Sequence, residues 1–160
     1  MSIKTVYVLV GNVASGKSTY IKTSGLDGAV ISKDDFRKHF GYFKGVGYLY
    51  DTNIEHYIDE IVKLYFLSYC SIGVENIFID ETNMTYRGRA FYKNIAKANG
   101  YRVVVVVFED CGEDEHVKRR RNAVGHGGVS EETWRRVYRE KRQRYEEPTL
   151  DEGFDEIIYV

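Results

Sequence analysis

The chain has 160 residues and a formal net charge of −1 at pH 7, with 43% hydrophobic and 29% charged residues. This length supports one substantial core and is too short for two ordinary domains, so we expect one domain over residues 1–160. The near-neutral charge excludes a uniformly basic nucleic-acid coat. No apolar run approaches the roughly 20 residues of a membrane span, and no signal-peptide pattern opens the chain, so we expect a cytoplasmic protein without a membrane partner.

The first predicted strand leads directly into the most specific motif. An apolar run, Thr5 to Val10, is followed by GNVASGKS at residues 11–18, which matches the phosphate-loop pattern G-x-x-x-x-G-K-[ST]. Glycines let the backbone curl with its amides inward, and the next helix adds its positive end. A flexible turn explains the glycines but not the Lys-Ser-Thr that follows. We therefore predict that these residues bind ATP: Gly11, Asn12, Ala14, Ser15, Gly16, Lys17, Ser18 and Thr19.

In this pattern each polar side chain has an assigned task. Lys17 reaches the terminal phosphates and Ser18 ligates Mg²⁺. The helix that begins here is expected to stop near Gly25, and a short strand follows at 29–32. A turn of helix is predicted over 34–40.

The next stretch is rich in glycine and aromatic residues. We expect residues 41–50 to form an ordered surface loop. Its aromatic rings offer a stacking platform for nucleic-acid bases, or they cover the edge of the sheet; both interpretations stay open.

A long amphipathic helix is predicted over residues 52–71. Thr52 and Glu55 have capping-box spacing, and apolar residues then recur every three or four positions. The remaining elements are a strand at 76–80, a helix at 87–99, a strand at 101–108, helices at 113–121 and 130–146, and a strand at 156–160. Because strands alternate with helices, we expect an α/β fold of the P-loop NTPase type, a parallel sheet flanked by helices.

Three polar clusters should meet at one end of this sheet. Ligands bind beyond the carboxyl ends of parallel strands, and residues 11–18, 32–37 and 80–83 all follow predicted strands. Asp34 and Arg37 lie one helical turn apart. A kinase must orient and deprotonate a hydroxyl acceptor, and Asp34 is our candidate for the base. A helix N-cap role for Asp34 or Asp35 is the alternative.

A second acidic position follows the strand near residue 79. Asp80 is a candidate for steadying hydrated Mg²⁺, and Glu81 competes with it for that role. A simple turn or cap role would also place an aspartate here.

The basic residues gather in the last third of the chain. Arg119, Arg120 and Arg121 precede a glycine-rich stretch at 125–128, and the next helix should begin at Ser130. This pattern indicates a small lid whose arginine stabilises charge on the γ-phosphoryl group and excludes water. A solvated helix face explains part of this charge equally well, and the spacing does not say which arginine acts.

Cysteines and histidines predict no further chemistry. Cys70 and Cys111 have neither metal-ligand spacing nor a disulfide framework, so we expect reduced thiols. The histidines show no metal spacing, and His126 is expected to be a polar loop residue.

The ordered series of segments resembles a known family. GNVASGKST, SKDDFRK, IFIDETN, YRGRAFYKNIAKANGYRVVVVVF, VKRRRN and YEEPTLDEGFDEIIYV together resemble the kinase domain of polynucleotide 5′-hydroxyl kinases over nearly the whole chain. The resemblance implies a tunnel-like P-loop kinase in which ATP and a nucleic-acid 5′ end enter from opposite sides. A D-x-D-G-T phosphatase signature does not occur in the sequence, so no 3′-phosphatase activity is expected.

The resemblance also implies residue roles. Asp34 falls on the general base, and Arg37 falls on an arginine that helps hold the acceptor strand. The lid arginine falls within Arg119 to Arg121, and the family's acidic residue falls on Glu81 rather than Asp80. Glu81 and Arg89 are therefore expected to contact the substrate.

The first hypothesis is an ATP- and Mg²⁺-dependent kinase acting on the 5′-hydroxyl of DNA or RNA. One alternative is a P-loop kinase acting on another hydroxyl, such as that of a nucleoside or of a hydroxymethylated base in DNA. A second alternative is an ATPase module with no phosphoryl acceptor.

Overall fold

The architecture is a five-stranded parallel sheet with helices on both faces. A computed structural model describes residues 3–123 and 129–160. In chain order the elements are β1 (Thr5–Val10), α1 (Lys17–Thr23), β2 (Ala29–Ile31), α2 (Lys33–Phe43), α3 (Thr52–Ile72), β3 (Asn76–Ile79), α4 (Tyr86–Ala98), β4 (Arg102–Val107), α5 (Glu113–Asn122), α6 (Glu131–Gln143), the 3₁₀ helix η1 (Leu150–Glu152) and β5 (Glu156–Tyr159).

The strand order is β2-β3-β1-β4-β5, and every pairing is parallel. The central strand β1 pairs with β3 through Val8 and Ile79 and with β4 through Val10 and Val107. The unbroken valines of β4 are buried on both faces, as a continuous apolar run in a parallel sheet requires. The predicted α/β fold with a parallel sheet is therefore confirmed.

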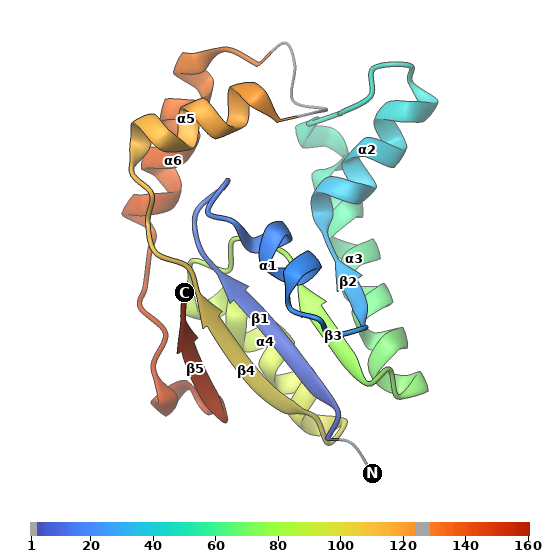
Figure 1. Cartoon of the computed structure of the whole chain (residues 1–160). Coiled ribbons are helices and arrows are strands. Elements are labelled where there is room, and N and C mark those ends of the chain that lie inside the picture. Colours follow the sequence, from blue (N-terminus) through green and yellow to red (C-terminus); the bar gives the residue numbers. More distant parts are fainter. Residues whose placement is uncertain (1–2, 124–128) are drawn as a thin grey trace.

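Helices cover the two faces unequally (Figure 1). The larger core lies between one face and α3 and α4, where Ile58, Val62 and Phe66 of α3 pack against the strand valines. On the other face α1 contributes Tyr20 and Ile21 to a smaller cluster. Both cores fix β1 in the middle of the sheet, so the loop that follows β1 starts from a rigid position.

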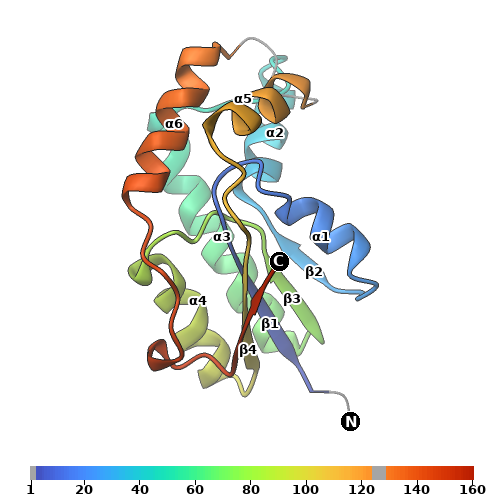
Figure 2. The same cartoon turned by 60° about the vertical axis from the view of Figure 1, so that its left-hand side comes forward.

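Two helices, α5 and α6, stand above the carboxyl ends of the strands, and α2 stands on the other side of the loop that follows β1 (Figure 1). We call α5 and α6 the lid. Figure 2 shows that α6 runs from its end near α5 down toward α4. Two contacts anchor α6 and the segment after it: the Asn12 side-chain amide donates to the Tyr138 carbonyl of α6 at 3.2 Å, and the Glu146 amide, beyond the helix end, donates to the Met84 carbonyl at 2.8 Å.

Within the described ranges, none of the helices combines the length and the apolar character needed to cross a membrane. Cys70 is buried and Cys111 is half-buried, and both are free thiols.

Two helices differ from their predicted lengths: α6 ends at Gln143 rather than near residue 146, and α2 is longer than predicted. Helix α2 continues to Phe43, so only the last part of the stretch 41–50 is a loop. Gly41 explains the difference because its backbone lies against the returning chain: its carbonyl accepts hydrogen bonds from the amides of Val46 at 2.8 Å and Gly47 at 3.2 Å. The loop folds back onto the helix end, which a local reading of glycine as a helix breaker does not anticipate.

Replacing Gly41 with alanine should destabilise the protein, although the same change usually stabilises a helix. A Cβ at this position would lie 2.7 Å from the Gly47 carbonyl oxygen, a backbone atom that has no freedom to rotate away. Gly41→Ala should therefore lower the free energy of unfolding by about 1–3 kcal/mol, although alanine normally stabilises a helix interior by about 0.5–1 kcal/mol. Urea unfolding followed by circular dichroism measures the change.

Gly88→Ala is the matched control for this prediction. Its Cβ would meet only the Thr85 hydroxyl oxygen, at 3.3 Å. A stability change within about 0.5 kcal/mol is expected for this surface-type substitution. A Gly41→Ala protein at least as stable as Gly88→Ala would contradict the packing argument.

Candidate active site

The loop between β1 and α1 has the curled backbone of an anion-binding site. Ala14 and Gly16 adopt left-handed conformations, with φ of 57° and 103°. At Gly11 the space is closed, because an added Cβ would lie 2.6 Å from the Ser15 hydroxyl oxygen and 2.9 Å from the Phe108 Cβ. The first amides of α1 have no partner within the helix and face the loop. The loop therefore presents backbone donors and a helix N-terminus to the same space.

Lys17 lies at the centre of this loop and is buried. Its ammonium donates to the carbonyls of Gly11 at 2.9 Å and Asn12 at 2.7 Å and to the Ser15 hydroxyl at 3.3 Å. Burial lowers the pKa of Lys17 to about 8, and the nearby Asp80 carboxylate opposes that shift. Because burial disfavours the charged form of Lys17, a bound polyanion would stabilise its ammonium group.

Ser18 and Asp80 join the loop to the end of β3. The Ser18 hydroxyl donates to Asp80 Oδ2 at 2.7 Å, and the Asp80 amide donates to the Ile31 carbonyl at 2.8 Å. Burial raises the pKa of Asp80, while the hydrogen bond from Ser18 and the charge of Lys17 act in the opposite direction. Hydroxyl and carboxylate oxygens are the ligand types that Mg²⁺ takes, so the donor set fits that ion.

Glu81 lies in a different environment from Asp80. Its carboxylate accepts a hydrogen bond from the Tyr92 hydroxyl at 2.9 Å and lies 3.6 Å from the Lys33 ammonium, which also pairs with Asp59 at 2.7 Å. Burial raises the pKa of Glu81, and Lys33 partly offsets that effect. Of the two competing acids, Asp80 contacts the phosphate loop and Glu81 belongs to a network among α2, α3 and α4.

Asp34 and Arg37 form the other half of the site. Arg37 donates to Asp34 Oδ1 at 2.6 Å and makes a two-pronged contact with the Glu55 carboxylate, at 2.9 and 2.7 Å. The Tyr48 hydroxyl also donates to Asp34 Oδ1, at 3.3 Å. Neither aspartate caps the helix, because the N-cap residue of α2 is Ser32. Asp34 is thus an oriented carboxylate at the end of β2.

The sequence reading missed Glu55 and Tyr48 as parts of this site. The predicted capping box that pairs Thr52 with Glu55 is wrong: Asp51 caps α3 by accepting from the Asn53 amide. Glu55 instead binds Arg37 from the first turn of the helix. The i,i+3 spacing suits either arrangement, so spacing alone does not separate them.

The three lid arginines point in different directions. Arg119 donates to Glu115 at 2.8 Å and to the Ala14 carbonyl of the phosphate loop at 3.0 Å. Arg121 donates to Glu131 at 3.2 Å. These two arginines therefore act within the lid and between the lid and the loop.

Arg120 is the arginine that faces the polar residues of the site. Its guanidinium lies 5.1 Å from the centre of the Trp134 ring. Burial lowers the pKa of Arg120, and the negative charges of Asp34 and Asp80 oppose that shift. The guanidinium thus lies over an aromatic ring and within the electrostatic influence of both carboxylates.

His116 fastens the lid to the phosphate loop. It is fully buried, and its Nδ1 lies 2.8 Å from the Val13 carbonyl, which can only accept, so Nδ1 carries the proton. Its ring also packs against Trp134 and Tyr138 of α6, with centroids 6.4 and 5.4 Å away. Sequence spacing identified this histidine only as lacking a metal motif.

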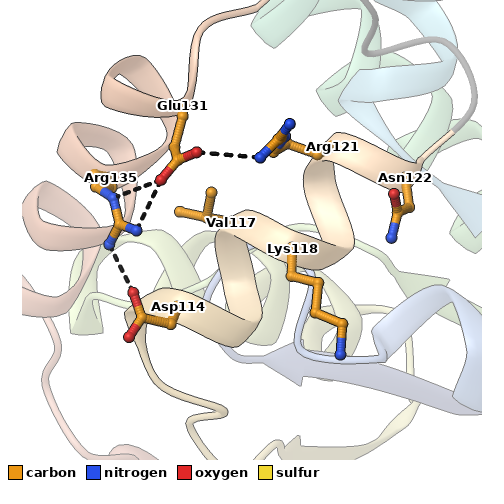
Figure 3. Close-up of a pocket in the computed structure, with 7 residues that line it drawn as sticks. All are labelled: Asp114, Val117, Lys118, Arg121, Asn122, Glu131 and Arg135. Atoms are coloured by element: carbon orange, nitrogen blue, oxygen red, sulfur yellow. Dashed lines mark hydrogen bonds and ion pairs between the residues drawn. The ribbon is translucent and has the colours of Figure 1, made fainter.

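A pocket of about 300 Å³ opens between α5 and α6 (Figure 3). Its charges are already paired, since Arg135 binds both Asp114 at 2.8 Å and Glu131 at 2.9 Å. Apart from Arg121 it contains none of the predicted site residues. Across residues 3–123 and 129–160, no group of three or more histidines, cysteines or acidic residues forms a metal cage. The predicted hinge at 125–128, with His126, lies outside the described residues.

Arg89 has a structural environment rather than the predicted substrate contact. Its side chain is 0% exposed. It makes a two-pronged contact with Glu152, at 3.0 and 2.6 Å, and donates to the carbonyls of Asn83 at 3.1 Å and Glu146 at 2.9 Å. No surface of Arg89 is left for a substrate. It instead ties the segment after α6 to α4.

The fold and this site define a P-loop kinase-like domain. In agreement, residues 6–148 match the AAA_33 family, described as an AAA domain, and the chain belongs to that family. None of the curated proteins matches the chain in sequence.

Several solved structures share the fold at low identity. An inferred kinase from Chloroflexus aurantiacus aligns with a TM-score of 0.70 and 17% identity, over 100% of this chain and 86% of that one. A fungal RNA kinase aligns at 0.62 and 16%, over 100% and 38%. The APS kinase CysC of Mycobacterium tuberculosis, solved with AMPPNP and APS, aligns at 0.54 and 16%, over 99% and 88%. The chain thus spans well under half of the fungal protein.

The burial of Arg89 predicts its mutational effect. Arg89→Met should lower the free energy of unfolding by about 3–5 kcal/mol, because it leaves the Glu152 carboxylate buried without its partner. Chemical denaturation measures the loss, and Arg89→Met with Glu152→Gln should recover part of it. A variant with wild-type stability but weakened binding of the phosphoryl acceptor would instead support a substrate role.

Proposed function

We propose that this protein is a polynucleotide kinase that transfers the γ-phosphate of ATP to the 5′-hydroxyl of DNA or RNA. The observation that carries the proposal is the meeting of two half-sites at one end of the sheet. Lys17, Ser18 and Asp80 form a cradle for a metal-bound triphosphate. Beside it, Arg37 and Tyr48 orient the Asp34 carboxylate. A simple nucleotide-binding module has no need for the second half-site.

The first half-site would hold the phosphoryl donor. The loop amides and Lys17 would bind the β- and γ-phosphates, and Ser18 would ligate Mg²⁺ with Asp80 holding the Ser18 hydroxyl in place. Bound Mg²⁺ supplies charge neutralisation on the phosphates. Arg120 would neutralise charge on the migrating phosphoryl group from the lid side. The AMPPNP in the APS kinase structure supports nucleotide binding by this fold.

The second half-site would activate the acceptor. Asp34 would accept the proton of the attacking hydroxyl as its oxygen bonds to the γ-phosphorus, and the bond from that phosphorus to the bridging oxygen of the leaving ADP breaks. The hydrogen bonds from Arg37 and Tyr48 restrict the rotation of the carboxylate. Holding the base in one orientation lowers the cost of reaching the transition state.

Two further observations favour a nucleic-acid acceptor over a small one. Structures with the same fold include a fungal RNA kinase and the Pnkp1/Rnl/Hen1 RNA repair complex. The end of α2 and the loop after it also expose three aromatic rings: Tyr42 is 78% exposed, Phe43 73% and Tyr50 62%. Exposed rings beside a kinase site suit base stacking, which contributes roughly 1–3 kcal/mol per base.

The decisive experiment uses γ-labelled ATP, Mg²⁺ and a single-stranded oligonucleotide with a 5′-hydroxyl. Label should appear on the 5′ end, and Asp34→Asn should cut kcat by about 10²–10⁴-fold with little change in the KM for ATP. Asp35→Asn is the matched control because that side chain is 69% exposed and pairs with Lys38 at 3.4 Å. It should retain near-normal turnover.

Other outcomes would redirect the assignment. Label found only as free phosphate would identify an ATPase, and label on a base or nucleoside would identify a kinase for another hydroxyl. An equal loss of turnover for Asp34→Asn and Asp35→Asn would show that neither carboxylate acts specifically as the base.

The lid arginines provide a second functional prediction. Arg120→Gln should lower kcat by about 10²–10³-fold, because it removes the guanidinium that faces Asp34 and Asp80. Arg121→Gln removes the same charge from the next position of α5 and disrupts a contact with Glu131 rather than one with the site carboxylates, so most of the turnover should remain. Steady-state kinetics with the labelled oligonucleotide measures both, and the reverse ranking would refute the assignment.

A further inference from the structure

Lys141 lies on the face of α6 that points toward the carboxyl ends of the strands. Tyr138 and Lys141 are three residues apart within α6, so they share one helix face, and Tyr145 follows just beyond the helix end at Gln143. Tyr138 donates to Asp110 at 2.8 Å, just beyond β4, and Tyr145 packs against the larger core. Lys141 is half-buried; the turn of α6 before it is anchored to Asn12 after β1, and Glu146, beyond the helix end, is bound to Met84 after β3.

The charge environment of Lys141 differs from that of its neighbours Lys33 and Arg37. Lys33 pairs with Asp59 and Glu81, and Arg37 pairs with Asp34 and Glu55. Among residues 3–123 and 129–160, no carboxylate lies within ion-pair distance of the Lys141 ammonium; the last ion pair of α6 belongs to Arg142 and Asp110.

The surroundings of Lys141 disfavour its charged form when no anion is bound. Burial lowers the pKa of Lys141, the positive charges of Lys33, Arg144 and Arg37 lower it further, and Glu81 opposes them. Proteins that collect cations around a half-buried ammonium commonly do so where an anion binds. The neighbours also give the location: Arg37 belongs to the acceptor half of the site, and Lys33 and Glu81 belong to the adjoining network among α2, α3 and α4.

We propose that Lys141 binds an anionic group of the phosphoryl acceptor, and that in a polynucleotide this group is the phosphodiester next to the accepting nucleoside. This inference rests on the proposed function for the identity of the acceptor. Arg37 is the obvious alternative, but two carboxylates already neutralise its guanidinium. Lys141 offers a charge that no carboxylate in the described part of the chain pairs with.

The test compares two acceptors that differ in one charge. One single-stranded 5′-hydroxyl oligonucleotide has a normal phosphodiester at its first linkage, and the other has a neutral methylphosphonate there. The wild-type protein should prefer the charged acceptor. Lys141→Gln should raise the KM for that acceptor about tenfold, the loss of one charge-assisted contact, and should abolish the preference while leaving the KM for ATP unchanged.

Two variants control this experiment. Arg136→Gln removes a charge from the outer face of the same helix, where the side chain is 67% exposed, and should behave as wild type. Lys141→Arg keeps the charge and should restore the preference. If Lys141→Gln folds normally and still prefers the charged acceptor, the inference is overturned while the proposed function stands.

A binding measurement separates failure of the inference from failure of the proposed function. Trp134 is the single tryptophan of the chain and lies on α6, so its fluorescence reports on that helix. Protein saturated with Mg²⁺ and AMPPNP is titrated with inorganic phosphate. Saturable binding that Lys141→Gln abolishes supports an anion site even if no polynucleotide is phosphorylated. Binding that is absent, or equal in both proteins, overturns it.

Discussion

Positive charge held out of water at the carboxyl end of the sheet is the constraint on which the rest of the structure depends. Lys17 is buried against carbonyl oxygens, and Arg120 lies over the ring of Trp134. Burial lowers the pKa of both groups, so a bound anion would stabilise both charges. The two apolar cores make this possible, because they fix β1 and therefore the phosphate loop rigidly enough to hold the charges in place.

The lid is built on that loop rather than beside it. His116 binds the Val13 carbonyl, Arg119 binds the Ala14 carbonyl, and Asn12 reaches the Tyr138 carbonyl of α6. All three contacts use backbone carbonyls or a side chain of the loop rather than its backbone amides. A change in loop backbone on nucleotide binding would therefore move the base of the lid, and Arg120 with it. The coupling is direct, since α5 carries Arg120 together with His116 and Arg119, which contact the loop.

Sequence reasoning performed well where the determinant is local. The octapeptide at 11–18 and the five valines of β4 each predict their local structure from a few residues. The alternation of strands and helices along the chain then predicts the parallel sheet. It failed where a partner comes from another element. Glu55 has helix-cap spacing yet binds Arg37, and Arg89, expected to contact the substrate, is buried in an ion pair with Glu152. Such pairings depend on how the elements pack, which residue spacing does not encode.

The division of the site into two halves explains why the fold alone leaves the acceptor open. The RNA kinase and the APS kinase share this fold at 16% identity, and a phosphate loop serves any kinase alike. Under the proposed function, acceptor specificity would reside in the residues that α2, α3 and α6 contribute. There Glu55 neutralises Arg37 and thereby turns it into a support for Asp34, while Lys141 has no such partner among the described residues. An acceptor with a negative charge near its hydroxyl would complete that half of the site, and a neutral one would leave the ammonium of Lys141 uncompensated.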